Sequence, residues 1–210
     1  MAEYSDNFNR ADGSLGDDWE VWAHDYGTNY PEIESNEVVS VDGEAAGAVW
    51  DGGEMASTDY FSQMICGGSG LKVSVRDNGV PHEETNCERY YLQGEGQWHQ
   101  YTKLFKVIGS TVTELDEAQN QGTSSAGETH KIEADGSNIA GYWGGSLRVE
   151  AEDTAITSKG APGFWFVRYA SESGDDWSAE DLAAVGPPTP TNLQGTPGTN
   201  SILWTWEAGE

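Results

Sequence analysis

The stretch YSDNFNRADGSLGDDWEVW, residues 4–22, decides how the rest of the chain is interpreted. It contains a short polar and apolar strand around Phe8, a turn at Asp12 and Gly13, and then a strand rich in Trp and Val. A related combination of Asp and Trp, GDDWSAED, returns at residues 174–181. We expect these segments, at opposite ends of one domain, to pair as its first and last strands. Such pairing closes a β-sandwich and removes edges that would otherwise seek partners.

Short alternating segments and turn residues fill the chain between these two ends. Residues 71–77 alternate apolar Leu and Val with polar Lys, Ser and Arg, which is typical of a half-buried strand, and residues 146–152 do the same. The turn GEG at 94–96, between residues 87–93 and 97–108, predicts a hairpin. No segment shows the helical period over a useful length. The sequence therefore predicts an all-β fold, a two-sheet antiparallel jelly-roll sandwich.

A change of composition near the C-terminus predicts a domain boundary. The sequence GPPTP at residues 186–190 is a stiff linker that cannot be part of a central strand. We divide the chain into a jelly-roll domain at 1–185, a Pro-rich linker at 186–191 and a short β segment at 192–210.

The last segment alternates apolar and polar residues after the turn PGTN. Ile202, Trp204 and Trp206 are predicted to share one strand face, and left bare they would form an apolar patch, so we expect an assembly contact there. The segment resembles the start of a fibronectin type III domain, which opens with Pro, a strand, a Pro-Gly-Thr/Ser-Asn turn and a Trp-bearing strand. The resemblance implies either one module of a longer protein or a tail that docks on another surface.

The charge of the chain excludes some classes of partner. There are 36 acidic residues against 10 basic ones, a formal net charge of -26. Such a surface repels nucleic acid and anionic lipid, so neither is expected as a partner. Two interpretations of the charge remain open. The acidic surface could keep an abundant protein soluble, or the protein could function at high salt concentration or in the presence of divalent cations.

The two cysteines, Cys66 and Cys87, match no metal or redox spacing, and we expect two free, half-buried thiols. The N-terminal MAEYSDNF lacks the basic and apolar regions of a secretory signal. No apolar run is long enough to cross a bilayer, so membrane insertion is not expected.

Five stretches of the sequence resemble the concanavalin A-like lectin/glucanase jelly rolls, in particular the LamG-like modules of bacteriophage virion proteins and bacterial surface proteins. They cover nearly all of residues 4–182 and are DNFNRADG at 6–13, the hairpin with Tyr90, Tyr91 and residues 98–105, IEADG at 132–136, GAPGF at 160–164 and DDW at 175–177. In that family the first and last strands pair. The resemblance leaves three roles open, a carbohydrate-binding face, a glucanase site or a structural part of an assembly, because a fold does not determine a function.

The glucanase role requires carboxylates that project from one strand to the same face. Retaining glucanases of this superfamily carry Glu-x-Asp-x-x-Glu, and the nearest match here, ELDEAQ, begins at Glu114. Glu114 and Asp116 have the spacing that places both on one side of a strand, but Gln119 stands where the third acid belongs. A second pair, Glu150 and Glu152, has no aromatic platform beside it in the sequence. We therefore predict no catalytic residues and a protein that is not an enzyme.

Sugar binding requires exposed aromatic rings with amide or carboxylate groups around them. The candidates lie on the central hairpin and at the next turn: Trp98, His99, Tyr101, Tyr142 and Trp143. The alternative for each is a place in the core, where large aromatic side chains of sandwich strands usually lie.

A metal site is implied by the family resemblance alone. Glucanases of this superfamily often hold a structural Ca²⁺ where the first and last strands meet, and the matching positions are Asp6 and Asp176. Carboxylate oxygens suit Ca²⁺. The alternative is that both are ordinary turn-forming residues. No cofactor is required by the sequence.

These observations lead to a first hypothesis, a non-enzymatic virion structural protein that serves as a capsid decoration, fibre or tail-associated module. It would be located in the virion after assembly in the host cytoplasm, with other virion subunits and further copies of itself as partners. It would also contact a host surface glycan. The alternatives are a carbohydrate-binding adhesin at the cell surface or outside the cell, and a glucanase-type glycoside hydrolase.

Overall fold

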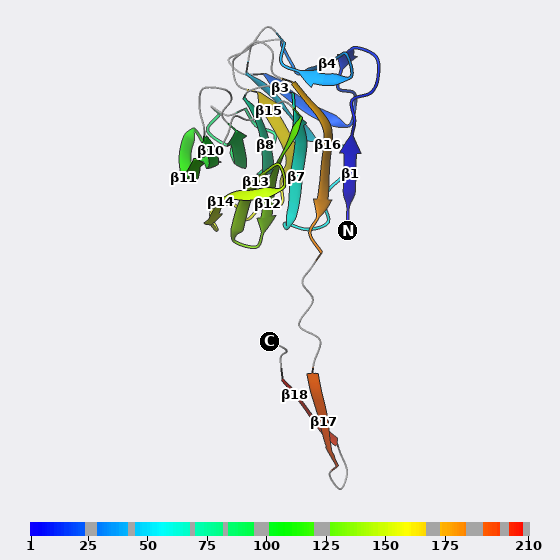
Figure 1. The fold of residues 1–210 in the computed structure, drawn as a ribbon, viewed down its shortest axis with the longest axis vertical. Coiled ribbons are helices and arrows are strands. Elements are labelled where there is room, and N and C mark those ends of the chain that lie inside the picture. Colours follow the sequence, from blue (N-terminus) through cyan, green and yellow to red (C-terminus); the bar gives the residue numbers. More distant parts are fainter. Residues whose placement is uncertain are drawn as a thin grey trace.

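A computed structural model describes residues 1–23, 29–41, 45–67, 70–81, 84–94, 101–119, 127–166 and 173–183, and the backbone of strands at 191–197 and 202–207. Over these ranges the secondary structure is entirely β, and the two large sheets pack face to face as a sandwich (Figure 1). The predicted all-β sandwich class is confirmed. No helix in the described ranges is long and apolar enough to span a membrane.

The first sheet has nine strands. Their bounds are β1 (Glu3–Asp6), β2 (Gly13–Ser14), β4 (Glu32–Glu34), β5 (Glu37–Val39), β7 (Tyr60–Cys66), β12 (Glu128–Asp135), β13 (Asn138–Trp143), β14 (Ser146–Glu152) and β16 (Ser173–Asp181). The strand order is β14-β13-β12-β7-β16-β5-β4-β2, and β1 also pairs with β16. In β7 every second residue is buried, as expected for a strand with one face on a core.

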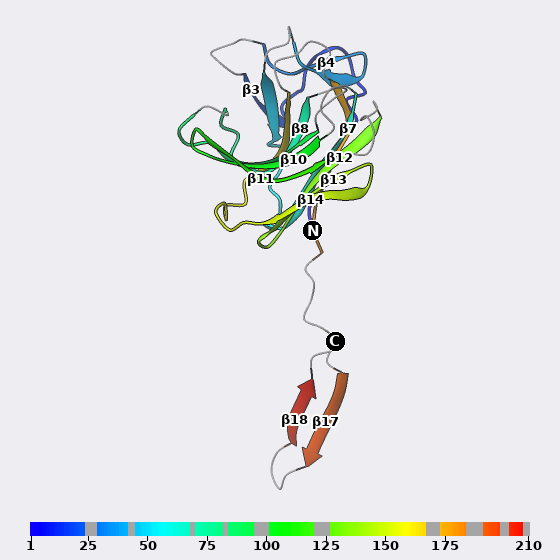
Figure 2. The same ribbon diagram turned by 60° about the vertical axis from the view of Figure 1, so that its left-hand side comes forward.

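The second sheet has seven strands. Their bounds are β3 (Trp19–Ala23), β6 (Ala46–Trp50), β8 (Leu71–Asp77), β9 (Glu88–Gly94), β10 (Tyr101–Ile108), β11 (Thr111–Gln119) and β15 (Ala161–Phe166). The strand order is β11-β10-β9-β8-β15-β6-β3. The predicted hairpin is present, since β9 and β10 pair antiparallel. On its other side β10 lies beside β11 (Figure 2). Strand β8 is buried along its whole length, so both faces of this sheet are covered there.

The two ends of the jelly roll meet as expected. Strand β1 pairs antiparallel with β16, and Asp6 lies opposite Trp177. The carboxylate of Asp181 also accepts a hydrogen bond of 2.5 Å from the backbone N–H of Ala2. The last long strand of the jelly roll therefore holds the first one in place.

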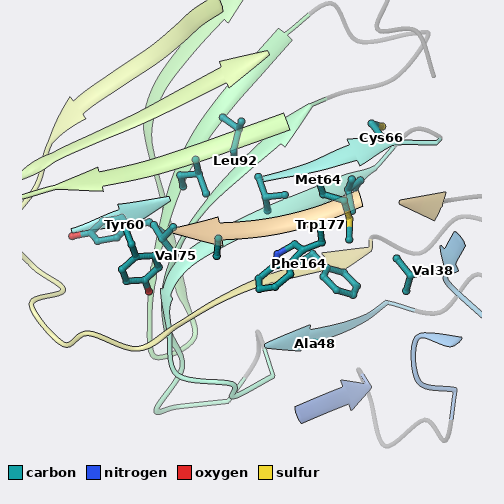
Figure 3. Packing of buried hydrophobic residues seen from close by; sticks show 14 of the residues in the cluster. Val38, Ala48, Tyr60, Met64, Cys66, Val75, Leu92, Phe164 and Trp177 are labelled. Carbon is teal, nitrogen blue, oxygen red and sulfur yellow. The ribbon is translucent and has the colours of Figure 1, made fainter. Parts of the chain in front are cut away.

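The core lies between the two sheets and is rich in aromatic side chains. Trp177 and Phe164, one from each sheet, face each other across it (Figure 3). The ring of Trp19 lies 4.7 Å from that of Trp177 and 5.1 Å from that of Phe164, centroid to centroid. Each such ring removes a large apolar area from water, at about 2–3 kcal/mol per side chain. The aromatic residues of the opening stretch are therefore what fixes the first strands to the core.

Strands β17 (Thr191–Pro197) and β18 (Ile202–Glu207) pair in a two-stranded sheet of their own. The predicted linker lies largely outside the described residues, as do the side chains of Ile202, Trp204 and Trp206. The domain division at 185 and 191 and the likeness to fibronectin type III therefore remain predictions.

Both cysteines are free thiols, but they are buried more deeply than the half-buried state expected. Cys66 is 3% exposed and Cys87 is not exposed at all. Burial raises the pKa of the Cys87 thiol, which keeps it protonated and unreactive.

Candidate functional site

The face of the seven-stranded sheet that points away from the core carries an unusual set of side chains. Residues that pair directly across neighbouring strands project to the same face. One such row crosses all seven strands, in the order Trp22, Gly47, Trp165, Lys72, Gln93, Lys103 and Glu117. This outward face is therefore lined by aromatic and charged groups where a plain surface sheet would carry small polar ones.

Aromatic rings run in contact along this outward face. The ring centroids of Trp22 and Trp165 lie 6.0 Å apart, those of Trp165 and Tyr91 5.3 Å, and those of Tyr91 and Phe105 4.9 Å with nearly parallel planes. Trp22, Trp165 and Tyr91 are buried, whereas Phe105 is half-buried. The line of rings therefore begins in a closed end at β3 and reaches solvent at β10.

Gly47 allows the closed end of this line to pack. A Cβ at Gly47 would lie 2.5 Å from the ring of Trp22 and 2.6 Å from the Cβ of Trp165. Both distances are far below contact, so the two indoles pack over a position that only glycine can occupy.

Lys72 lies within the aromatic line although its side chain is almost fully buried. Its ammonium nitrogen is 3.6 Å from the centroid of the Trp165 ring and 5.3 Å from that of Tyr91. Aromatic faces attract cations, and the attraction grows when water is excluded. The rings therefore help to hold a positive charge on the outward face of a strongly acidic protein.

The open end of the face lies over β9, β10 and β11. Gln93, Tyr101, Lys103 and Phe105 are half-buried there. The ammonium of Lys103 forms an ion pair of 3.2 Å with Glu114 and one of 2.8 Å with Glu117. The hydrogen bond to Glu117 is the main reason why the pKa of Lys103 is raised.

A β-bulge in β11 separates the carboxylates that the sequence places together. Glu114 pairs with Phe105 on the outward face, while Asp116 pairs with Leu104, which is buried in the core. The extra residue between them, Leu115, packs against the core. Glu114 and Asp116 therefore point to opposite faces, and the same-face arrangement expected from their spacing is wrong.

The carboxylate of Asp116 has a structural role instead. It accepts hydrogen bonds from the backbone N–H groups of Glu117 and Glu150, and the second bond joins β11 to β14. The acid that shares the outward face with Glu114 is Glu117, and Lys103 binds both.

The five aromatic and histidine candidates for sugar binding do not form one cluster in the described part of the chain. Tyr101 lies on the outward face of the seven-stranded sheet, whereas Tyr142 lies on the outward face of the other sheet beside Lys131. Trp143 is buried, and its indole N–H donates to the Glu128 carboxylate. The remaining two, Trp98 and His99, lie outside the described residues.

The metal candidates Asp6 and Asp176 both line an open hollow of about 460 Å³ where β1 meets β16. The carboxylate of Asp6 accepts hydrogen bonds from Arg10 at 2.6 and 2.9 Å and from the indole of Trp19 at 2.9 Å. Burial opposes ionisation of Asp6, but these hydrogen bonds outweigh it and lower its pKa. Across the described ranges no three Asp, Glu, His or Cys side chains gather as a metal site would require.

The aromatic line could be recognised only in part from the sequence. Its members are Trp22, Tyr91, Phe105 and Trp165. They lie far apart in the sequence and are brought together only by the order of the strands in the sheet. The alternation of polar and apolar residues in β8 does predict that Lys72 points away from the core. It does not predict that Trp165 covers it.

Neither the family models nor the curated proteins provide a match to this sequence. Solved structures do match, at low identity. The carbohydrate-binding module CBM66 from Bacillus subtilis is 14% identical with a TM-score of 0.51, covering 69% of this chain and 86% of that one. A prokaryotic β-1,3-1,4-glucanase (lichenase) from a mouse hindgut metagenome is 13% identical with a TM-score of 0.56, covering 87% and 100%.

The carbohydrate recognition domain of Emp46p in its potassium-bound form is 10% identical with a TM-score of 0.55, covering 79% of this chain and 89% of that one. At these identities the likeness shows the fold alone. The chain therefore has the jelly-roll sandwich fold of these proteins, which include a glucanase as well as carbohydrate-binding domains. Structural likeness therefore leaves the choice between binding and catalysis open.

Proposed function

We propose that this chain is a carbohydrate-binding module whose ligand lies on the outward face of the seven-stranded sheet, over β9, β10 and β11. The observation that carries this proposal is the open end of the aromatic line. Phe105 and Tyr101 offer partly exposed rings for stacking on a sugar, and Gln93 and Lys103 lie between and beside them. Rings that stack and a few convergent polar groups are what a sugar site needs.

A glycan array followed by titration calorimetry tests this site. Phe105→Ala is expected to weaken binding at least tenfold, because a stacking ring contributes about 1.4 kcal/mol or more. The matched control is Tyr30→Ala, which removes a 44% exposed aromatic side chain next to β4 in the other sheet and should leave affinity unchanged. Equal effects of the two substitutions, or no glycan bound by the wild type, would refute the site.

We propose further that the module binds without cleaving its ligand. Glu114 and Asp116 project to opposite faces, and Lys103 holds Glu114 and Glu117 together as ion pairs. A retaining glycosidase needs one protonated acid and one nucleophilic carboxylate facing the same bond. Reducing-sugar release from β-1,3-1,4-glucan is therefore expected to be absent. Hydrolysis by the wild type that Glu114→Gln abolishes would overturn this proposal.

A second candidate function is the structural role in a virion, as a decoration, fibre or tail-associated subunit in several copies. The observation that favours it is the separate sheet of β17 and β18, because a two-stranded sheet alone is marginally stable in water. A partner that completes this sheet would stabilise it. Native mass spectrometry should then find oligomers that Trp204→Ser and Trp206→Ser dissociate, whereas a monomer at high concentration would count against the role.

We also propose that a structural Ca²⁺ binds where β1 meets β16. Asp6 and Asp176 border the same hollow, and Arg10 already forms an ion pair with Asp6.

A further inference from the structure

The hollow lies between β1 and β16 of the nine-stranded sheet, whereas the site proposed above lies on the seven-stranded sheet. It is lined by Ser5, Asp6, Asn7, Asp176, Trp177 and Ser178. Ser5 and Ser178 are direct cross-strand partners, so two hydroxyl groups share one face of the sheet. The lining therefore offers hydroxyl, amide and carboxylate groups within one space of about 460 Å³.

A β-bulge in β16 shapes this hollow. Asp175 pairs with Ile65 and Ser178 pairs with Gln63, so two residues of β16 lie opposite Met64 alone. Asp176 adopts a φ of 48° in the bulge and is exposed. Left-handed backbone is uncommon for a residue other than glycine, although Asp tolerates it better than most. Glycine would suit this backbone better, so the fold alone does not require a carboxylate here.

The hollow continues into a row of side chains across the same sheet. Gln63 pairs with Ser178, and its amide donates to the Ser178 hydroxyl at 3.0 Å. Lys131 is the next residue in the row and Tyr142 follows it. The row thus runs from β1 over β16, β7 and β12 to β13, strands that lie side by side in Figure 1. At about 4.8 Å per strand, it is roughly 19 Å long.

Two aromatic rings border the far end of the row. The ammonium of Lys131 lies 4.5 Å from the ring centroid of Phe61 and 5.1 Å from that of Tyr142. It also forms an ion pair of 2.6 Å with Glu133. Phe61 and Tyr142 are only half-buried, so they present ring surface to solvent beside a fixed cation. Burial and the nearby carboxylates Glu133 and Glu150 raise the pKa of Tyr142, which keeps its hydroxyl a hydrogen-bond donor.

The hollow and the row of side chains that continues from it form one track across β1, β16, β7, β12 and β13. We infer that this track is a second carbohydrate-binding site, which takes an uncharged polysaccharide chain. Hydroxyl-rich rings would hydrogen-bond to Ser5, Asn7, Asp176 and Ser178 in the hollow and stack on Tyr142 at the other end. A module with sites on both faces of the sandwich links two polysaccharide chains, which a one-sided module cannot do.

The charges along the track select the class of ligand. Asp176 lies in the hollow, and Glu180 and Glu133 flank Phe61 on the same face of the sheet. Lys131 is already paired with Glu133, and Arg10 with Asp6. The track is therefore negative, so uronate-bearing or sulfated chains are repelled and neutral chains are accepted.

Three variants separate this second site from the first. Asp176→Gly removes the carboxylate from the hollow and leaves a residue suited to the φ of 48°. Tyr142→Ala removes the half-buried ring at the other end. The double substitution Tyr101→Ala with Phe105→Ala disables the site on the seven-stranded sheet. Each is tested on an array of neutral glucans, mannans, galactans and fructans, with alginate as the anionic probe, and thermal unfolding checks that each variant is folded.

Two readouts decide the outcome. The double variant should keep residual binding to a neutral polysaccharide, and adding Asp176→Gly or Tyr142→Ala to it should reduce that binding at least tenfold. The wild-type protein should make a soluble neutral polysaccharide turbid, and disabling either face should abolish the turbidity. If the double variant alone loses all binding while Asp176→Gly and Tyr142→Ala bind and cross-link as the wild type, the second site is refuted and the first stands. If only the track variants lose binding, the second site stands and the first is refuted.

Discussion

His130 is a completely buried histidine in the nine-stranded sheet. Its ring lies 4.0 Å from that of Trp143, centroid to centroid, and beside Gly94, where a Cβ would lie 2.6 Å from the imidazole. Burial lowers the pKa of His130 from 6.5 to about 4, because the imidazolium would lose its hydration. The side chain is therefore neutral in the folded protein at any pH near neutrality.

The lowered pKa of His130 predicts acid sensitivity. The unfolded chain takes up a proton near pH 6.5 and the folded one only near pH 4, so stability is full above pH 6.5 and is lost as the pH falls between these values. The loss approaches about 3 kcal/mol at pH 4. Urea unfolding of the wild type and of His130→Phe at pH 7, 5.5 and 4.5 measures this loss of stability. The carboxylate titrations are common to both proteins, so the difference between them isolates the contribution of His130. An identical pH dependence in the two proteins would contradict the prediction.

The packing of Trp22 and Trp165 on the outward face of the seven-stranded sheet requires glycine at position 47. Gly47→Ala places a methyl group 2.5 Å from the Trp22 ring, so the indoles or the strand must move. Overpacking of this kind is expected to lower the free energy of unfolding by about 1–3 kcal/mol. Urea unfolding measures this, with Thr111→Ala, at an exposed position of the same sheet, as the control that should change stability by less than about 0.5 kcal/mol. An unchanged midpoint for Gly47→Ala would show that the tryptophans are not held in this arrangement.

At the scale of the strands, Asp181 links three segments at the end of β16. Its carboxylate accepts hydrogen bonds from the backbone N–H groups of Ala2 at 2.5 Å, Ser57 at 3.0 Å and Ala56 at 3.2 Å. Burial opposes ionisation of Asp181, but the hydrogen bonds lower its pKa. The link between β1 and the sandwich therefore needs the ionised carboxylate, and it weakens as the pH falls below about 4.

Asp181→Ala is expected to lower the free energy of unfolding by about 2–3 kcal/mol, because three donors lose a charged acceptor. Hydrogen exchange should show the loss first as faster exchange in β1. The matched control is Asp51→Ala, at an exposed carboxylate, which should change stability by less than about 0.5 kcal/mol. Unaltered exchange in β1 would mean that its pairing with β16 does not depend on Asp181.

The bulges in β11 and β16 show that a prediction from residue spacing fails where a strand is irregular. Spacing of two residues places side chains on one face only when a strand is regular. The extra residue at Leu115 sends Glu114 and Asp116 to opposite faces, and the bulge at Asp176 opens a hollow. Neither bulge has a sequence signal of its own, because each arises from pairing with a neighbouring strand.

For the whole molecule, the net charge of -26 predicts a stability that depends on salt. Repulsion among the carboxylates is greater in the compact state and is screened by ions. Raising NaCl from about 0.05 to 0.5 M should therefore raise Tm by several degrees. A decrease in Tm over this range would show that attractive ion pairs dominate instead.

The same experiment with divalent ions tests the Ca²⁺ proposal. Millimolar CaCl₂ should raise Tm more than MgCl₂ at equal concentration if Asp6 and Asp176 hold Ca²⁺, and Asp176→Asn should remove the difference. Equal effects of the two salts would mean that screening alone is at work.

Local patterns in the sequence are enough to predict the all-β class, the hairpin of β9 and β10, and the pairing of the first and last strands of the jelly roll. These follow from local alternation, turn residues and aromatic content, which each act over a few residues. Which side chains share a face, by contrast, follows only from the arrangement of the strands in space. Trp22, Trp165, Tyr91 and Phe105 lie far apart in the chain and meet only because the strand order brings them together. Strand order and bulges depend on long-range pairing, and a single strand carries no record of its neighbours.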